Sequence, residues 1–274
     1  MTGTLRLAVT GGGGRTGRET IAAARGRGHE VAVAVNRTPA DPVAGVAVEP
    51  ADRLPDLLAA ADPRPDALID FTGPSSSADY VEACADAGVP AVVGTTGFDG
   101  GGRDRLRAAA DTIPVLKATN FARGIQALRR AVREAVAALP GYDVELTETH
   151  HNGKRDAPSG TARTLLSDVE AVRDDLDART HGRAGEAPRS ASAVGVHARR
   201  AGDVTGEHEL LIAGNRETLT LTHRAGSRGV FAAGALDAAA WLAGRKPGWY
   251  GFDDVVRGEG DGDGSEAGDG GEGS

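Results

Sequence analysis

The chain has little sulfur and no long hydrophobic run. Its 274 residues include one cysteine, Cys84, and one methionine, which excludes a disulfide framework and a cysteine-based metal site. No apolar stretch approaches the roughly 20 residues that cross a bilayer, and residues 1–4 lead into an expected strand without a signal-peptide pattern. We therefore expect a cytoplasmic protein with no metal site, whose redox chemistry would need a borrowed cofactor.

Lysine is also scarce, and the charge is unevenly distributed. Only three of the 31 basic residues are lysines (Lys117, Lys154 and Lys246), so a lysine beside histidines carries more weight than usual. The formal charge of −8 owes much to residues 258–274, which hold six of the 39 acidic residues and no basic ones. That glycine-rich segment cannot bury enough apolar surface to fold, and we expect a disordered, solubilising tail.

Short apolar runs alternate with helical patterns in the first half of the chain. The expected strands are residues 5–10, 31–36, 67–71, 91–94 and 114–118, and the expected helices are 16–27, 75–87, 103–111 and 121–139. This alternation is typical of a Rossmann-like, doubly wound parallel sheet in an α/β protein.

The pattern changes after residue 141. We expect strands at 142–149, 204–213 and 217–223, with a turn at Gly214-Asn215, and helices at 161–176 and 229–242. The sequence thus predicts an α/β domain followed by an α+β unit with a mixed sheet. Trp241, Trp249, Tyr250 and Phe252 give the C-terminal segment apolar mass, which we expect to pack on the first domain.

A glycine-rich stretch, "VTGGGGRTGRE" at residues 9–19, joins the first strand to the first helix. Gly11, Gly14 and Gly17 stand at three-residue spacing. After a strand and before a helix, such glycines allow a tight turn, a close approach to a pyrophosphate and close helix packing. An ordinary glycine-rich turn is the alternative, but the context favours a dinucleotide site.

The end of the second strand bears on which dinucleotide is bound. Asn36 stands where an acidic residue usually holds the adenosine ribose, and Arg37 follows it. A carboxylate would repel a 2′-phosphate, whereas an amide tolerates it and a guanidinium can bind it. The pair predicts NADPH in preference to NADH, or acceptance of both, unless Arg37 is simply a solvated surface residue.

Residues 148–161, "ETHHNGKRDAPSGT", place proton donors beside a potential anion site. His150 belongs to the residue type that changes charge near neutral pH, which suits a general acid, and Lys154 can supply charge or a proton. Gly160 and Thr161, with Ser159 as a possible cap, offer N–H and hydroxyl groups at a helix N-terminus, a natural receptor for a carboxylate. A structural histidine and a plain helix cap are the alternatives.

Two other functional classes stay open at this point. The glycine stretch also resembles short-chain dehydrogenase-like proteins, some of which only sense dinucleotides. Active members of that group use Tyr-x-x-x-Lys, but none of the three tyrosines (Tyr80, Tyr142 and Tyr250) has a lysine four residues later. A different NADP-linked enzyme for a small dicarboxylate is the second alternative.

Seven segments together resemble the 4-hydroxy-tetrahydrodipicolinate reductase family, also called dihydrodipicolinate reductases. They are "GGGGRTGR" (11–18), "DFTGP" (70–74), "VVGTTGF" (92–98), "TNF" (119–121), "HHNGKRDAPSGTA" (150–162), "RAGDVTGEH" (200–208) and "SRGVFAAGA" (227–235). The resemblance covers nearly the whole chain before the tail. It implies reduction of 4-hydroxy-tetrahydrodipicolinate to tetrahydrodipicolinate with loss of water, in the diaminopimelate route of lysine biosynthesis.

The resemblance also implies roles for individual residues. His150 would be the proton donor and Lys154 a second donor. The expected contacts to the substrate carboxylates are His151, Ser159, Gly160 and Thr161. The expected contacts to the dinucleotide are Gly11, Gly12, Gly13, Gly14, Arg15 and Thr16 at the pyrophosphate, Asn36 and Arg37 at the ribose, Gly94, Thr95 and Thr96 along the nicotinamide half, and Thr119, Asn120 and Phe121 at an interdomain hinge.

The implied architecture is a discontinuous dinucleotide-binding domain (residues 1–121 with 229–257) and a substrate-binding, tetramerising domain (122–228). We expect a homotetramer that binds a small dicarboxylate and neither nucleic acid nor membranes. Two departures from the family bear on function and packing: Asn36 stands where the family often has an acidic residue, which puts its acceptance of NADH in doubt, and Thr16 replaces a bulkier apolar residue.

Overall fold

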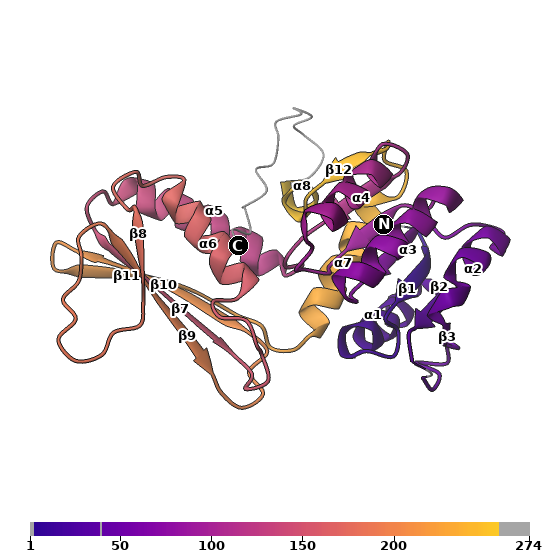
Figure 1. Cartoon of the computed structure of the whole chain (residues 1–274), viewed down its shortest axis with the longest axis horizontal. Coiled ribbons are helices and arrows are strands. Elements are labelled where there is room, and N and C mark those ends of the chain that lie inside the picture. Colours follow the sequence, from indigo (N-terminus) through magenta and orange to yellow (C-terminus); the bar gives the residue numbers. More distant parts are fainter. Residues whose placement is uncertain (1–2, 39, 258–274) are drawn as a thin grey trace. The chain divides into compact units, whose positions relative to one another are not determined.

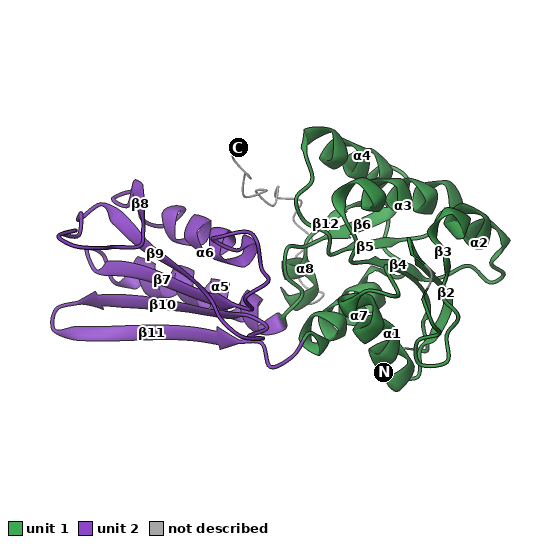
Figure 2. Cartoon of the chain, turned by 60° about the horizontal axis from the view of Figure 1, so that its bottom comes forward, with its two compact units in different colours: residues 1–122, 228–263 green, residues 123–227, 264–274 purple. Residues whose placement is uncertain are grey.

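The computed structural model describes residues 3–38 and 40–257, which divide into two compact units (Figure 2). The described residues up to Ala122, together with those from Arg228 onward, form unit 1, and residues 123–227 form unit 2. The acidic segment 258–274, expected to be a disordered tail, lies outside the described residues. Within the described ranges, no helix is long and apolar enough to cross a membrane.

Unit 1 is built on a seven-stranded parallel sheet in the order β3-β2-β1-β4-β5-β6-β12. The strands are β1 (Arg6–Thr10), β2 (Glu30–Asn36), β3 (Glu49–Pro50), β4 (Ala67–Asp70), β5 (Ala91–Val93), β6 (Pro114–Lys117) and β12 (Gly248–Tyr250). The order reverses between β1 and β4, which makes this the switch point where doubly wound sheets bind ligands. The expected Rossmann-like sheet is confirmed.

Helices cover both faces of this sheet (Figure 1). They are α1 (Arg15–Gly26), α2 (Leu54–Ala60), α3 (Pro74–Ala87), α4 (Gly100–Ala110), α7 (Gly229–Leu242) and α8 (Phe252–Arg257), with a short 3-10 helix at Ala51–Arg53. Alternate strand residues enter different cores: Leu7 and Val9 pack with α1 and α7, whereas Ala8 packs with the α3 and α4 side. Burial on both faces explains why these strands read as continuous apolar runs.

The C-terminal segment returns to unit 1, as expected from its aromatic residues. β12 pairs in parallel with β6 at the sheet edge. The ring of Phe252 lies 5.1 Å from that of Phe121, and Trp241 lies 5.3 Å from Tyr250. Phe121 and Phe252 are 1% and 2% exposed, so both rings belong to the core of unit 1.

Unit 2 holds a five-stranded mixed sheet in the order β11-β10-β7-β9-β8, with its two helices on one face (Figure 1). The elements are α5 (Arg123–Ala138), β7 (Asp143–His150), α6 (Gly160–Glu170), β8 (Ala178–His181), β9 (Ala193–Arg200), β10 (Glu207–Gly214) and β11 (Glu217–Arg224). β9 pairs in parallel with β7 and β8, and β10 pairs antiparallel with β7 and β11. Buried residues alternate with more exposed ones along β7 and β10, as expected when one face packs on helices.

Two expectations about unit 2 are wrong in detail. The hairpin turns at Asn215-Arg216, not Gly214-Asn215, because Gly214 still pairs with Glu217 and both turn residues have positive φ, 46° and 66°. This is the backbone of a two-residue turn that matches strand twist. The helix expected to reach residue 176 ends at Glu170, and the nearly buried Arg173 turns back to bind the carbonyl oxygen of Leu139 instead.

Candidate active site

The glycine loop in unit 1 has the geometry of an anion site. Gly11 has a φ of +66°, and its carbonyl oxygen accepts from the Gly14 N–H at 2.8 Å. A Cβ on Gly17 would overlap that same carbonyl oxygen, so α1 can start this close to β1 only with glycine. Gly14 caps α1 without a side chain, which leaves the first N–H groups of the helix facing an incoming phosphate. The loop therefore fits a dinucleotide pyrophosphate.

The remaining predicted residues near this loop differ in exposure. Arg15 is exposed, Thr16 is partly exposed and Gly12 is buried. Asn36 donates to the carbonyl oxygen of Thr38 at 2.8 Å, and its Nδ2 lies 2.8 Å from where a Cβ on Gly13 would be. The end of β2 and the glycine loop thus lie side by side, with the exposed Arg37 next in the chain.

The residues predicted along the nicotinamide half follow β5, and those predicted at the interdomain hinge follow β6. Gly94 donates its N–H to the carbonyl oxygen of Asp70 at 2.8 Å, Thr95 is buried, and Thr96 is exposed. Thr119 is exposed, and Asn120 accepts from the Ala122 N–H at 2.8 Å. The Phe121 side chain belongs to the core, so it positions this segment by packing between Phe71 and Phe252.

In unit 2, His150 ends β7 and lies in a network of charged groups. Its Nδ1 is 2.5 Å from Oε2 of Glu148, which is fully buried. Burial alone would raise the pKa of Glu148, but hydrogen bonds from His150 and Arg200 lower it to about 2. An ionised carboxylate only accepts hydrogen bonds, so Nδ1 carries a hydrogen and the His150 ring is oriented by Glu148.

Arg200 and the start of α6 complete this network. The guanidinium of Arg200 donates to both oxygens of Glu148, at 2.9 and 2.8 Å. The Ser159 N–H donates to the same carboxylate at 3.2 Å, and Ser159 Oγ accepts from the Ala162 N–H as the helix cap. One buried carboxylate therefore fixes both the imidazole of His150 and the N-terminus of α6.

His208 borders the same group from β10. Its ring centroid is 5.2 Å from that of His150, and its Nε2 is 3.1 Å from Ser159 Oγ. Burial lowers the pKa of His208 to about 3, with the positive charge of His150 adding to the effect. His208 is therefore neutral at physiological pH, and Ser159 is committed to the cap and to His208.

The loop between β7 and α6 carries the remaining predicted residues. Lys154 forms an ion pair with Asp156 at 2.7 Å, and its N–H donates to the His151 carbonyl oxygen. The His151 ring lies over Gly153, 3.4 Å from where a Cβ there would be. Gly160 and Thr161 open α6, with Thr161 largely buried. The structure thus places all the predicted substrate-site residues at one end of β7.

Sequence reasoning missed three residues of this network: Glu148, Arg200 and His208. Glu148 stands two residues before His150, a spacing that puts both side chains on one face of a strand. Arg200 and His208 bracket the "RAGDVTGEH" segment. Their contacts arise because β9 and β10 flank β7, which local pattern does not reveal.

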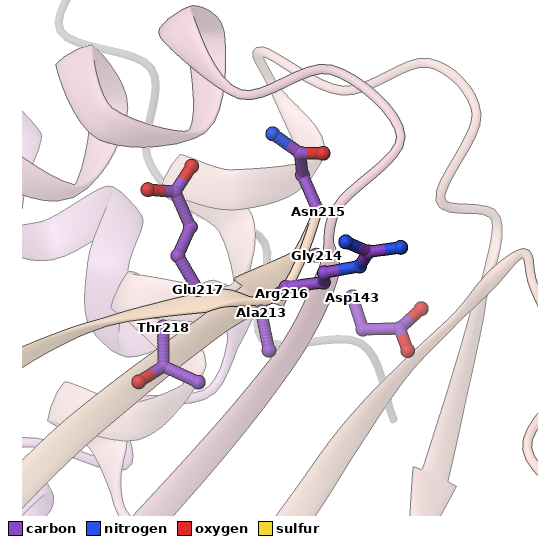
Figure 3. Close-up of a pocket in the computed structure, with 7 residues that line it drawn as sticks. All are labelled: Asp143, Ala213, Gly214, Asn215, Arg216, Glu217 and Thr218. Atoms are coloured by element: carbon purple, nitrogen blue, oxygen red, sulfur yellow. The ribbon is translucent and has the colours of Figure 1, made fainter.

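A surface pocket of about 450 Å³ lies elsewhere in unit 2, where β7 begins and the β10–β11 hairpin turns (Figure 3). The carboxylates of Asp143 and Glu217 line it with a single cation, Arg216. It lies at the opposite end of β7 from His150, and its two carboxylates would repel a dicarboxylate ligand. We do not assign the active site to it.

No group of acidic, histidine or cysteine side chains in the described ranges could hold a metal ion.

Comparison with known proteins agrees with this geometry. The N-terminal region of dihydrodipicolinate reductases matches residues 5–121, and the C-terminal region matches residues 124–256. The 4-hydroxy-tetrahydrodipicolinate reductase of Natronomonas pharaonis is 58% identical over 92% of this chain and 100% of its own length. That of Haloarcula marismortui is 52% identical over 92% of this chain and 98% of its own length.

Among solved structures, a dipicolinate-bound dihydrodipicolinate reductase from a Paenisporosarcina species has a TM-score of 0.72 and 24% identity. It matches over 92% of this chain and 100% of its own, and it shows a shared fold. The family resemblance found in the sequence motifs is confirmed by the two regional matches and by the two relatives above 50% identity. The chain belongs to the dihydrodipicolinate reductase family.

Proposed function

We propose that this chain reduces 4-hydroxy-tetrahydrodipicolinate to tetrahydrodipicolinate with loss of water, in the diaminopimelate route of lysine biosynthesis. The observation that carries the proposal is the Glu148–His150 pair beside the N-terminus of α6. It combines a proton donor with an anion receptor, in a chain whose relatives at 58% and 52% identity bear this enzyme's name.

The chemistry divides between the two units. A reduced nicotinamide dinucleotide, when bound at the glycine loop, supplies the hydride for C4 of the conjugated cyclic imine that forms once water has left. As the C3–C4 double bond is reduced, negative charge develops toward C3. His150 gives a proton to that carbon from Nε2, because Nδ1 is held by Glu148.

Nε2 of His150 has room for this transfer. It lies beside Gly206, where a Cβ would approach to 3.1 Å. The Glu148 carboxylate stabilises the protonated imidazole electrostatically, and Arg200 holds that carboxylate in turn. Proton donation therefore depends on a chain of three side chains from two neighbouring strands.

The substrate has two carboxylates, and we assign their binding to the residues around the α6 N-terminus. The N–H groups of Gly160 and Thr161 and the helix dipole favour an anion, and His151 and Lys154 lie on the adjoining loop. Lys154 forms an ion pair with Asp156, which favours its action as an electrostatic anchor over that of a second proton donor. Ser159 contributes as the cap rather than through a substrate contact.

We further propose that NADPH is preferred over NADH. Family membership supports a nicotinamide dinucleotide, and the end of β2 presents an amide and an exposed guanidinium rather than a carboxylate. Asn36 lies next to Gly13, so a 2′-phosphate there would meet Arg37 without a repelling charge.

A homotetramer is proposed on the shape of unit 2. In the described chain, α5 and α6 both pack on the same face of the mixed sheet, and the other face carries no helix (Figure 1). Thr218, Thr220 and Thr222 of β11 stand on that open face beside Leu211 of β10. Light scattering of the purified protein tests the assembly. The expected cytoplasmic location stays a prediction.

The proposed reaction is tested by following dinucleotide absorbance when the protein meets the product freshly made by the synthase from pyruvate and aspartate semialdehyde. We expect rapid oxidation, faster with NADPH than with NADH. Folded protein that binds the dinucleotide but oxidises neither would refute the reductase assignment and favour a sensor. Turnover of an open-chain amino acid such as aspartate instead would favour a different dehydrogenase.

A further inference from the structure

Asp70 ends β4 as a completely buried carboxylate that ties together three neighbouring segments. Its Oδ1 accepts from the hydroxyls of Thr10 and Thr72, both at 2.6 Å, and its Oδ2 accepts from the Thr95 hydroxyl at 2.5 Å. Thr10 ends β1, Thr72 follows β4 and Thr95 follows β5. A single side chain therefore links the carboxyl ends of three adjacent strands.

The direction of these hydrogen bonds marks Asp70 as an acceptor. Thr95 Oγ1 already accepts from the Thr72 N–H at 2.9 Å, so its own hydrogen is free to point toward Asp70. The three donors to the carboxylate are hydroxyls rather than a guanidinium or an ammonium group. Hydroxyls satisfy the lone pairs of a buried carboxylate but supply no positive charge to balance it. Burying such a charge without a counter-charge costs desolvation free energy.

The sheet order shows where this charge lies relative to a bound dinucleotide. The adenosine ribose belongs at the end of β2 beside Asn36, and the pyrophosphate belongs at the start of α1. β4 and β5 lie on the other side of β1 from β2. A dinucleotide that crosses the switch point must therefore extend its nicotinamide half over the ends of β4 and β5, above Asp70.

We propose that Asp70 is a positioning residue for the nicotinamide half of the dinucleotide, and that its uncompensated negative charge favours the oxidised ring. The inference rests on the proposed dinucleotide-dependent reduction. A reduced nicotinamide ring is neutral and becomes cationic when the hydride leaves with its electron pair. A fixed negative charge near a bound ring would stabilise the cation selectively, and the threonine hydroxyls that bind Asp70 fix the ends of β1, β4 and β5 around it.

The first test replaces the charge and keeps the shape, with Asp70→Asn. Dissociation constants for NADPH and NADP+ are measured without substrate, by fluorescence or calorimetry. We expect the ratio of the NADP+ constant to the NADPH constant to rise roughly tenfold, because one unit charge near the ring is lost at an effective dielectric constant of about 20. The matched control, Thr20→Val, changes another fully buried threonine, whose hydroxyl donates to the Thr16 carbonyl oxygen. Its ratio should equal that of the wild type.

A second pair of variants tests positioning while the carboxylate stays in place. Thr10 is fully buried and cannot touch a ligand. Thr10→Val removes one hydrogen-bond donor to Asp70 and should weaken the binding of both NADPH and NADP+ several-fold. Thr10→Ser keeps the hydroxyl and should bind both dinucleotides with the wild-type affinity. Thermal melts establish that each variant is folded.

Three results decide the matter. A wild-type ratio in Asp70→Asn overturns the electrostatic part, and unchanged affinities in Thr10→Val overturn the positioning part. If Asp70→Asn does not fold, the Thr10 pair still decides whether the cluster acts on binding. Because these constants are measured without substrate, they are separate from the turnover assay: a wild type that binds dinucleotide but lacks turnover refutes the proposed function alone.

Discussion

Replacing Glu148 with glutamine isolates the part of the active site that prepares His150 as a proton donor. The glutamine amide keeps the size of the side chain and loses its charge. Glu148 is fully buried and holds hydrogen bonds from His150, Arg200 and the Ser159 N–H. The amide oxygen can serve only part of that set, and the protonated imidazole loses its counter-charge.

The size of the effect follows from the carboxyl group itself. Hydrogen bonds from His150 and Arg200 lower its pKa from 4.5 to about 2, so His150 contacts the ionised form. Losing a hydrogen bond to a charged group typically costs about 1.5–3 kcal/mol, so kcat should fall about 10- to 100-fold.

The assay measures kcat, with dinucleotide affinity measured separately. Glu148→Gln should lower kcat because the protonated imidazole that donates the proton loses its counter-charge. Dinucleotide affinity should not change, since its site lies in unit 1.

Glu145→Gln is the matched control. Glu145 lies on the same strand but points to the opposite face, where it pairs with His197 and Arg183. That variant should retain the wild-type kcat. A Glu148→Gln enzyme that is folded and keeps the wild-type kcat would refute the role assigned to this pair.

Three further outcomes follow from the structure. Gly17→Ala should abolish dinucleotide binding or destabilise unit 1, because the new Cβ would overlap the Gly11 carbonyl oxygen; calorimetric binding that matches the wild type would contradict the loop geometry. Arg37→Ala should weaken NADPH binding about tenfold and leave NADH unchanged, and Asn36→Asp should act in the same direction, as competition between the two dinucleotides would show. The pKa of His208 lies at about 3, below the ordinary 6.5, so the unfolded chain takes up a proton that the folded chain excludes and stability falls as the pH drops from about 6.5 towards 3. The free energy of unfolding, measured with urea, should decrease between pH 7 and pH 5 by about 2 kcal/mol more in the wild type than in His208→Gln. An equal decrease in both proteins would show that His208 is not the group that is protonated on unfolding.

Local sequence patterns were sufficient to predict those elements whose structure depends on residues close together in the chain. The glycine spacing at residues 11–17 predicts the strand, turn and helix of the dinucleotide site because each glycine meets a steric demand within that short stretch. The cap at Ser159 and the start of α6 are likewise set by neighbours in the chain.

Long-range pairing explains what the sequence did not reveal. Arg200 reaches Glu148, 52 residues away, because β9 lies beside β7 in a register that pairs His150 with Arg200. The hydrophobic pattern predicted neither β8 nor β9. The segment before residue 193 is polar, and buried and exposed residues do not alternate regularly along β9. The Asp70 cluster was missed for the same reason, because its three threonines meet only when the parallel sheet has formed.

Comparing wild type and His150→Gln in the oxidation of NADPH by the synthase product tests directly whether His150 donates the proton. We expect turnover by the wild type and a kcat at least 100-fold lower in the variant, with NADPH affinity and substrate KM changed less than about threefold. A variant that keeps wild-type kcat would contradict the assignment of His150 as the proton donor, and with it the mechanism proposed for this site.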